Sequence, residues 1–154
     1  MENVMRRRDR QIADNEAKEI LCREDYGFLA TVSSDGLPYG VPLNYCYSDD
    51  AIYFHCAVEG RKLDNINFNN NVSFCVVGKA DVIPSKFSTK YESVIASGKV
   101  YELTGVEKFN GLMKLVNKYS PGLEEKGRKY AEADAHKTRV YKIVPDSITG
   151  KSNE

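Results

Sequence analysis

Three short alternating segments, separated by turns of only a few residues, constrain the fold of this chain most strongly. They cover residues 27–33, 38–47 and 51–57, with Ser34-Asp35-Gly36 and Ser48-Asp49-Asp50 between them. A period of two in the side-chain pattern is typical of β-strands, and both connections consist of turn-forming residues. Parallel strands need crossovers of a dozen or more residues, so these strands are predicted to form an antiparallel meander.

The rest of the chain predicts helices and further strands. Helical patterns occupy residues 14–24, the segment from Gly60 to the Asn69-Asn70-Asn71 run, and residues 123–136 in part. A capping box, Thr104-Gly105-Val106-Glu107, opens another helix, whose apolar positions are Val106, Phe109, Leu112, Met113 and Val116 and which stops at Tyr119-Ser120-Pro121-Gly122. Further strands are expected at residues 72–78, 91–103 and 138–144, the first of them buried on both faces. Residues 79–90 are expected to be a long functional loop, and residues 146–154 a polar tail.

This pattern predicts one domain over residues 1–154, mainly β within the α+β class, with residues 1–10 as an N-terminal arm. About six strands with antiparallel links and flanking helices favour a small closed barrel, because an open meander would leave strand edges unprotected.

Charge and cysteine usage exclude several classes of function. The chain has 22 basic and 22 acidic residues, so no global field favours nucleic acid or a membrane surface, and we expect neither as a partner. The four cysteines form no CxxC pair and have no histidine at zinc-finger spacing, which argues for reduced structural thiols and against a metal site. No apolar run reaches membrane-spanning length and the N-terminal arginines precede no apolar signal region, so we expect a cytoplasmic protein.

Arg61 and Lys62 are the first candidates for a binding site. They fall in the first turn of the helix that follows Gly60, where the helix dipole and unpaired N–H groups already favour negative charge. Two cations at that end destabilise a helix unless an anion such as phosphate binds there. The alternative is a solvated pair of surface charges, and the pattern alone leaves both open.

His55 is the second candidate. Alternation places it with Tyr53 and Ala57, on the face opposite Ile52, Phe54 and Cys56. A neutral imidazole just before the proposed phosphate site could contact a ligand or relay a proton, although a lone histidine in a strand is more often a packing residue. Pro42 and Asn44 share the small face of their strand, where a flat ligand could approach the backbone or an edge could simply meet water.

No motif supports serine-nucleophile chemistry, a Walker loop or a dinucleotide fingerprint. What remains is a fold that binds a phosphorylated, flat organic molecule.

Several segments together resemble the flavin-binding split-barrel superfamily of pyridoxamine phosphate oxidase, most closely its nitroimidazole-reductase (Nim-type) branch. They are Met5–Arg10, Gly27–Val32, Asp35–Tyr45, Ile52–Ala57, Gly60–Lys62, Tyr91–Gly98 and Thr149–Lys151. The resemblance implies a six-stranded antiparallel split β-barrel of Greek-key type, and a homodimer with two FMN sites at the subunit interface.

Carried over residue by residue, the resemblance implies three groups of ligand contacts. Arg61 and Lys62 would hold the FMN phosphate. The ring would lie against Pro42, Leu43, Asn44 and Tyr45, with His55, Cys56 and Ala57 beside it. Tyr91, Glu92 and Ser93 would reach the site from the partner subunit. Cys56 departs from the family, in which a small residue such as glycine is usual at that position.

The activity implied is a flavin-dependent oxidoreductase that takes electrons from NADH, NADPH or another donor and reduces a small acceptor such as a nitro-aromatic, with His55 next to the substrate. Two alternatives remain: an FMN carrier or sensor without turnover and, less favoured, heme or pyridoxal-phosphate binding on the same barrel.

Overall fold

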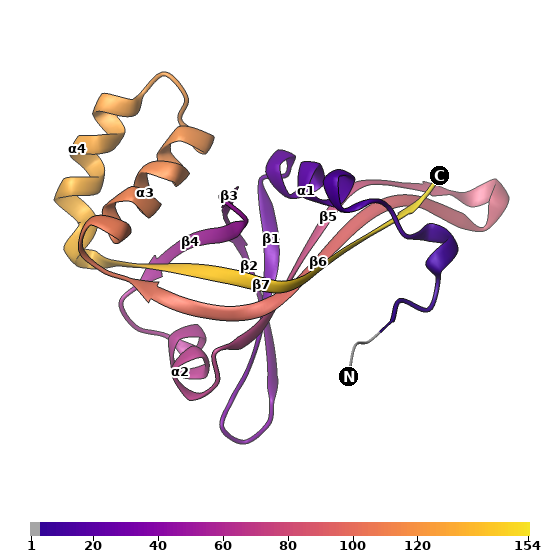
Figure 1. The fold of residues 1–154 in the computed structure, drawn as a ribbon, viewed down its shortest axis with the longest axis horizontal. Helices are drawn as coiled ribbons and strands as arrows, with labels where there is room; N and C mark the ends of the chain where they lie inside the picture. Colours follow the sequence, from indigo (N-terminus) through magenta and orange to yellow (C-terminus); the bar gives the residue numbers. More distant parts are fainter. Residues whose placement is uncertain (1–3) are drawn as a thin grey trace.

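The computed structural model describes residues 4–154, and these residues form seven strands and four α-helices (Figure 1). The strands are β1 (Tyr26–Val32), β2 (Pro38–Asn44), β3 (Cys46–Ser48), β4 (Ala51–Ala57), β5 (Asn71–Ile83), β6 (Ser88–Leu103) and β7 (Thr138–Asn153). The helices are α1 (Asp14–Arg23), α2 (Arg61–Phe68), α3 (Gly105–Tyr119) and α4 (Glu124–Asp134). Part of the expected N-terminal arm, residues 1–3, lies outside the described residues; Arg8–Arg10 form a single 3₁₀ turn.

All seven strands belong to one antiparallel sheet with the order β2-β1-β5-β6-β7-β4-β3. The antiparallel α+β class is confirmed, but β2 and β3 do not pair with each other, so the expected closed six-stranded barrel is not what the structure contains. Only Tyr45 links these two outermost strands along the chain. The sheet must therefore curl until its opposite edges lie one residue apart, which protects both edges without closing the hydrogen-bonded ladder.

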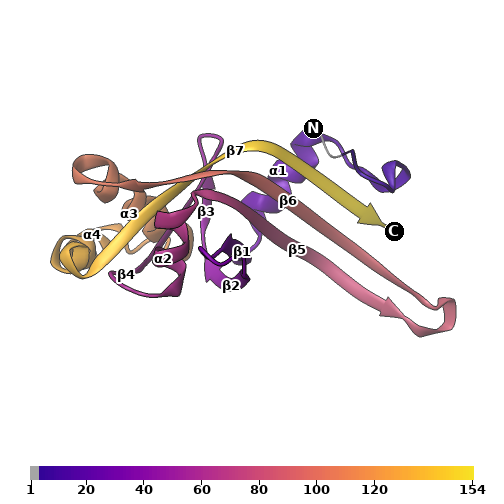
Figure 2. The same ribbon diagram turned by 90° about the horizontal axis from the view of Figure 1, so that it is seen from below.

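Apolar side chains pack on both faces of the sheet. The larger cluster lies inside the curl and joins Leu29, Phe54, Phe74 and Ile143 to Leu21 of α1 and Leu63 of α2. A second cluster packs the α3–α4 pair against the outer face of β4 through Tyr53, Val140, Leu112 and Ala131. Figure 2 shows the two helices at one end of the curved sheet. Strand β4 is therefore buried on both faces over most of its length.

Burial on both faces had been expected of residues 72–78, and there the prediction is wrong. Val72, Phe74 and Val76 are buried, whereas Ser73 and Cys75 are half-buried and Val77 is exposed. The apolar residues of β5 face the core at alternate positions, as in a strand with one face packed on the core.

The residues expected to form a loop, 79–90, instead continue the sheet. Strand β5 runs on to Ile83, Pro84–Lys86 form a 3₁₀ turn, and β6 starts at Ser88. The resulting hairpin extends away from α3 and α4 (Figures 1 and 2). Its tip carries Phe87, which is 99% exposed and has left-handed backbone angles.

Strand β7 extends to Asn153, so the prediction that residues 146–154 form a tail is wrong. It pairs with β6 over most of its length, from Val140 opposite Leu103 to Asn153 opposite Tyr91. The second half of β7 gives no clear strand pattern in the sequence because most of its residues are polar. Among residues 146–153, the half-buried Ile148 and the buried Gly150 are the positions that pack on the core.

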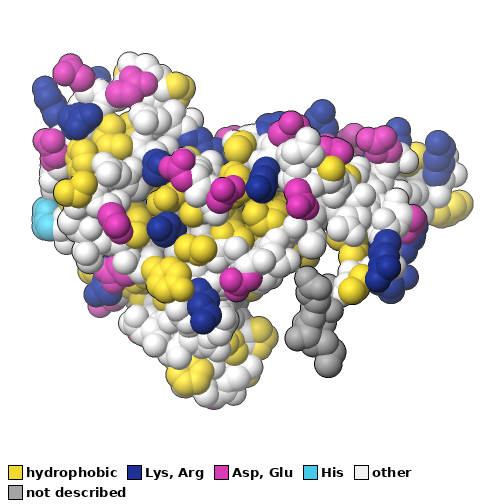
Figure 3. Space-filling model, viewed as in Figure 1, with side chains coloured by type: hydrophobic (Ala, Val, Ile, Leu, Met, Phe, Trp, Pro, Cys, Tyr) yellow, Lys and Arg dark blue, Asp and Glu magenta, His cyan; other side chains and the backbone are white. Residues whose placement is uncertain are grey.

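Helix α3 follows Thr104 as expected, but no side chain caps it and Gly105 takes a positive φ of 58°. Its buried residues are Gly111, Leu112 and Leu115, while Val106 is exposed. Over residues 4–154, no helix combines the length and the apolar character needed to span a membrane. Basic and acidic side chains are interspersed on the face in Figure 3, in keeping with the balanced charge.

Candidate functional site

The turn from β4 into α2 builds the corner at which the two predicted phosphate ligands lie. Gly60 has φ = 144°, a conformation that side chains rarely adopt, and the helix starts at Arg61. No side chain caps this helix. The N–H groups of Leu63 and Asp64 donate to the Gly60 carbonyl, and the first turn therefore presents the remaining amides of Arg61 and Lys62 outward.

Arg61 leans towards β2. Its guanidinium carbon lies 4.6 Å from the centroid of the Tyr39 ring, within cation–π distance. Its charge also helps to lower the pKa of Asp35, after the larger contribution of the Ser33 hydroxyl. In the part of the chain that the structure describes, neither Arg61 nor Lys62 forms an ion pair. Both cations are therefore available to an anionic ligand.

Lys62 leans towards the end of β4. The pKa of His55 lies below its ordinary value because of partial burial and, secondly, because of the Lys62 charge. His55 is nevertheless still exposed at the surface, on the same face as Tyr53 and opposite Phe54, as alternation predicts. A lowered pKa keeps this imidazole neutral at neutral pH, with one ring nitrogen able to donate and the other able to accept.

Cys56 and Ala57 complete the end of β4. Cys56 is half-buried against the main core, and burial raises the pKa of its thiol, with Lys62 and Arg139 opposing the shift. At neutral pH it is therefore a packing thiol rather than a nucleophilic thiolate. Ala57 is exposed and pairs with Thr138 at the start of β7.

The end of β2 presents only part of its predicted ring-binding segment. Pro42 and Asn44 face outward, Leu43 is half-buried, and the Tyr45 side chain is completely buried. The Tyr45 hydroxyl donates to the Leu21 carbonyl at 2.6 Å. Tyr45 as a whole has no exposed surface, so in this structure it supports the segment from within the core.

A pocket of about 860 Å³ brings Asn44 and His55 together. The sheet supplies one wall, with Asn44, His55 and Thr138. The opposite wall comes from α3 and α4 and is mainly apolar, with Leu112, Leu115, Val116, Leu123 and Ala131. Polar groups of Lys126, Asp134 and Lys137 lie among them. A mainly apolar cavity with a few convergent polar groups is typical of a small-molecule site.

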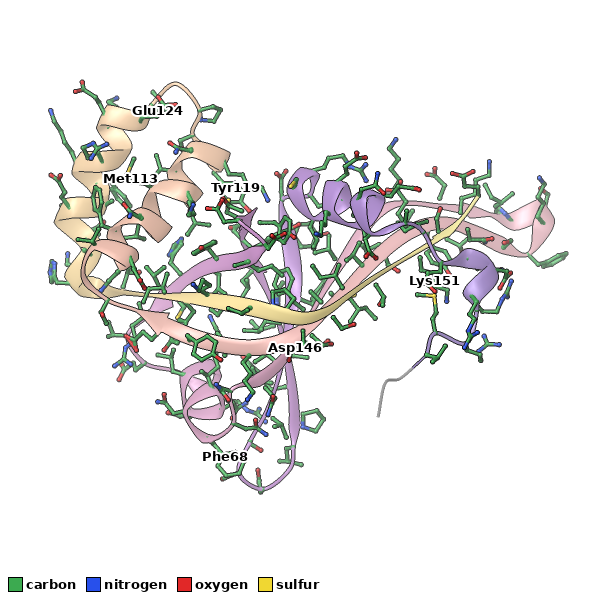
Figure 4. All side chains as sticks on the ribbon, in the orientation of Figure 1. Phe68, Met113, Tyr119, Glu124, Asp146 and Lys151 are labelled. Carbon is green, nitrogen blue, oxygen red and sulfur yellow. The ribbon has the colours of Figure 1, made fainter. Side chains whose placement is uncertain are left out.

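Tyr91, Glu92 and Ser93 lie far from this pocket within one chain. Along β7, His55 is opposite Val140, whereas Tyr91 is opposite Asn153. Thirteen positions at a strand's rise per residue correspond to about 40 Å. In Figure 4, Lys151, the partner of Ser93, is well separated from Met113 and Tyr119 of α3.

The surroundings of these three residues are polar. The Arg23 guanidinium lies 2.5 Å from the Glu92 carboxylate. Burial raises the pKa of Glu92, but hydrogen bonds from the Lys79 N–H and then from Arg23 outweigh it and leave that pKa below its ordinary value. Arg10 donates to the Tyr91 hydroxyl at 3.4 Å. Lys151 and Arg10 together lower the pKa of Tyr91.

Sequence reasoning missed Tyr39, Tyr119 and the whole helical wall of the pocket. Tyr39 shares the half-buried face of β2 with Val41 and Leu43, but its stacking under Arg61 depends on how α2 docks. The apolar residues of α3 and α4 carry the same signal whether they face a core or a cavity. Among residues 4–154, no three histidine, cysteine or acidic side chains gather as metal ligands would.

The fold defines an antiparallel α+β protein with a cationic strand-to-helix turn and a mainly apolar pocket. Asn44 and His55 line that pocket, whereas Arg61 and Lys62 do not. A family model described as pyridoxamine 5'-phosphate oxidase matches residues 13–152. The chain therefore belongs to the pyridoxamine 5'-phosphate oxidase family. No curated protein is significantly similar to it in sequence.

Solved structures support the same assignment. A candidate 5-nitroimidazole antibiotic resistance protein from Bacteroides thetaiotaomicron is 25% identical, with a TM-score of 0.75 over 94% of this chain and 90% of that one. A FAD-binding protein from Mesorhizobium loti is 23% identical, with a TM-score of 0.66 over 94% and 98%. A flavocytochrome from Azotobacter vinelandii is 18% identical, with a TM-score of 0.83 over 99% and 73%. The last two show likeness of fold alone.

Proposed function

We propose that this protein binds FMN at the β4–α2 corner and acts as a flavin-dependent oxidoreductase. One observation carries the proposal: within residues 4–154, two cations without ion-pair partners stand at a helix start that no side chain caps, and the charge of one of them acts on His55, which lines an apolar pocket. Membership of the family and its likeness to flavin-binding folds support a flavin over other flat phosphorylated ligands.

The residues present fit FMN. Arg61, Lys62 and the free amides of the first turn of α2 would hold the phosphate. The outward side chains of Pro42 and Asn44 and the half-buried Leu43 would lie along one side of the ring, with the buried Tyr45 supporting them from the core. His55, Cys56 and Ala57 would lie along the other.

When bound, the flavin supplies the electron transfer from a donor such as NADH or NADPH to a small acceptor. Neutral His55 would orient the acceptor with its single N–H, and its other ring nitrogen would take up a proton at that site. The apolar wall from α3 and α4 would exclude water. A nitro-aromatic acceptor is proposed from the description of the Bacteroides relative.

We further propose a homodimer in which Tyr91, Glu92 and Ser93 complete the site of the other subunit. The separation of about 40 Å along β7 prevents these residues from reaching the pocket of their own chain. The outer face of the sheet offers a surface for this contact, since Phe28, Cys75 and Ile95 lie in register across three strands there. Phe28 and Ile95 are 43% and 47% exposed.

Comparing FMN with riboflavin tests the phosphate site. Each charge-assisted hydrogen bond to phosphate contributes about 1.5–3 kcal/mol. Replacing Arg61 or Lys62 with alanine should therefore weaken FMN binding roughly ten- to hundredfold and leave riboflavin binding nearly unchanged. Lys99→Ala, at an exposed position of β6, is the matched control. Equal losses for both ligands would show that these cations do not bind the phosphate.

Anaerobic reduction separates an oxidoreductase from a carrier. Bleaching of the bound flavin by NADH or NADPH, followed by reoxidation with a nitro-aromatic, is the expected result. A flavin that binds but stays oxidised with both donors would favour the carrier or sensor. A protein that takes up no flavin at all would rule out both.

A further inference from the structure

The break between β2 and β3 leaves one residue, Tyr45, outside the hydrogen-bonded ladder of the sheet. Asn44 is the last residue of β2 paired with β1, opposite Tyr26, and Cys46 is the first residue of β3 paired with β4, opposite Tyr53. Tyr45 lies between them and is completely buried. Its N–H and C=O therefore need hydrogen-bond partners from elsewhere in the protein.

The last turn of α3 supplies these partners. The Tyr45 N–H donates to the Tyr119 hydroxyl at 2.9 Å. The Tyr119 hydroxyl can donate in turn to the Tyr45 carbonyl, at 2.8 Å, or to the Asp25 carbonyl. The Lys118 ammonium donates to the Tyr45 carbonyl at 2.9 Å and to the Glu24 carbonyl at 2.5 Å.

The Lys118 ammonium also lies 4.0 Å from the centroid of the Tyr45 ring. In the described residues it forms no ion pair with a carboxylate. Taking a cation partly out of water costs free energy, and burial therefore lowers the pKa of Lys118. The carbonyl oxygens of Glu24 and Tyr45 and the face of the Tyr45 ring offset this cost only while Tyr45 keeps its observed backbone conformation.

The same contacts reach the pocket. Asn44 donates through its side-chain amide to the Asp25 carbonyl at 2.9 Å, and the Tyr119 hydroxyl contacts that carbonyl too. Asn44 and Tyr119 both line the pocket that contains His55. The position of Asn44 is thus tied to the end of α3 through one shared acceptor.

We propose that Lys118 and Tyr119 are positioning residues that hold the Pro42–Tyr45 segment in place, so that its outward side chains, Pro42 and Asn44, are preorganised to receive the flavin ring. This inference rests on the proposed flavin site. Lys118 adds a fixed positive charge next to that segment, and a positive charge nearby favours the reduced, more negative state of a flavin. Removing the Lys118 charge should therefore lower the reduction potential of the bound flavin.

Two variants with minimal change of shape test the proposal. Lys118→Met keeps the aliphatic stem and removes the charge, and Tyr119→Phe keeps the ring and removes the hydroxyl. We expect each to weaken FMN binding about tenfold, as the loss of one fixed hydrogen bond or charge would. Lys118→Met should also lower the midpoint potential, and Lys118→Arg should restore it.

The matched control is Lys114→Met, one turn earlier on the same helix. Lys114 pairs with Asp49 at 2.9 Å and lies over the Tyr53 ring, with no contact to Tyr45. It should leave affinity and potential as in the wild type. If Lys118→Met and Tyr119→Phe also match the wild type in both, the positioning role is wrong.

Amide hydrogen exchange in the flavin-free protein separates this inference from the proposed function. Tyr119→Phe should expose the Tyr45 N–H to exchange, while amides in the middle of β6 keep their protection. Unchanged protection of Tyr45 would overturn the positioning role even if the protein binds FMN. If Tyr119→Phe loses protection of the Tyr45 N–H but the protein binds no flavin, the positioning role stands and the proposed flavin site is wrong.

Discussion

At the scale of single residues, His55 is the group most sensitive to its neighbours. Its pKa is lowered by partial burial and by Lys62. Replacing Lys62 with methionine removes the second cause and should raise the His55 pKa part of the way towards its ordinary value of about 6.5. A two-dimensional NMR titration of the flavin-free protein measures this, with Lys90→Met as the control and His136 as an internal reference. A fall in the His55 pKa would contradict the geometry.

The same lowered pKa makes stability depend on pH with a definite sign. Below a pH of about 6.5 the unfolded chain protonates this histidine before the folded protein does, so stability falls as the pH decreases through that window. His55→Gln should flatten this part of the profile while leaving stability at pH 8 nearly unchanged. Urea unfolding at pH 8, 6.5 and 5.5 measures the difference. An unchanged slope would mean that His55 keeps an ordinary pKa.

A buried hydrogen bond between Asn65 and Thr31 fastens α2 to the sheet. The Asn65 amide donates to the Thr31 hydroxyl at 3.0 Å, and both residues are buried. Asn65→Ala leaves that hydroxyl unpaired and should cost about 1–3 kcal/mol in the free energy of unfolding. Asn67→Ala, exposed on the same helix, should cost little. Equal effects would show that the buried pair does not anchor the helix.

The sequence predicts single residues well where position in an element decides their environment. The outward face of His55 and the place of Arg61 and Lys62 in the first turn of α2 follow from alternation and from Gly60. The burial of Tyr45 does not, because it results from a strand break whose backbone groups are satisfied by a helix about seventy residues later in the chain.

At the scale of elements, the two turns inside the β1–β4 region were predictable because they are local. The single strand predicted over residues 38–47 is wrong, because Tyr45 divides it into β2 and β3, which lie at opposite ends of the strand order. The hairpin of β5 and β6 was not predictable, since Pro84 and the serine and threonine residues around it look like loop chemistry. The second half of β7 was missed for a related reason: its pairing with β6 is a tertiary contact that compensates for weak intrinsic preference.

A bulge gives the β6–β7 pair its bend, and one glycine permits it. The register shifts between Ser97 and Gly98, and a Cβ on Gly98 would lie 2.1 Å from the Val144 carbonyl oxygen. Gly98→Ala should therefore destabilise the protein by about 1–3 kcal/mol or more, because the obstacle is backbone. Gly40→Ala is the control, as its Cβ would meet nothing within 4 Å. Thermal unfolding compares the two, and similar midpoints would refute the clash.

At the scale of the whole molecule, the proposed shared site can be tested by mixing two defective chains. One carries Arg61→Ala and Lys62→Ala; the other carries Tyr91→Ala and Ser93→Ala. In a two-fold dimer made from one copy of each, one site collects every substitution and the other collects none. Co-expression with two affinity tags should restore about half of the wild-type FMN content. No recovery would indicate that each chain builds its own site.

The curl of the sheet was only partly accessible from sequence. The need to protect strand edges predicts that the sheet bends round on itself. Whether its two edge strands, β2 and β3, also form hydrogen bonds with each other depends on the length of the link between them. Here the link is Tyr45 alone, and the ends of β2 and β3 meet without pairing.

The central place of β7 has a consequence for how the chain is made. In the strand order, β7 lies between β6 and β4, and β4 pairs with nothing else except the three-residue β3. A nascent chain therefore carries two unsatisfied strand edges throughout the synthesis of α3 and α4. The two halves of the sheet can join only after residues 138–144, which pair with β4 and with β6, have left the ribosome. Until then both edges are open to pairing with other chains.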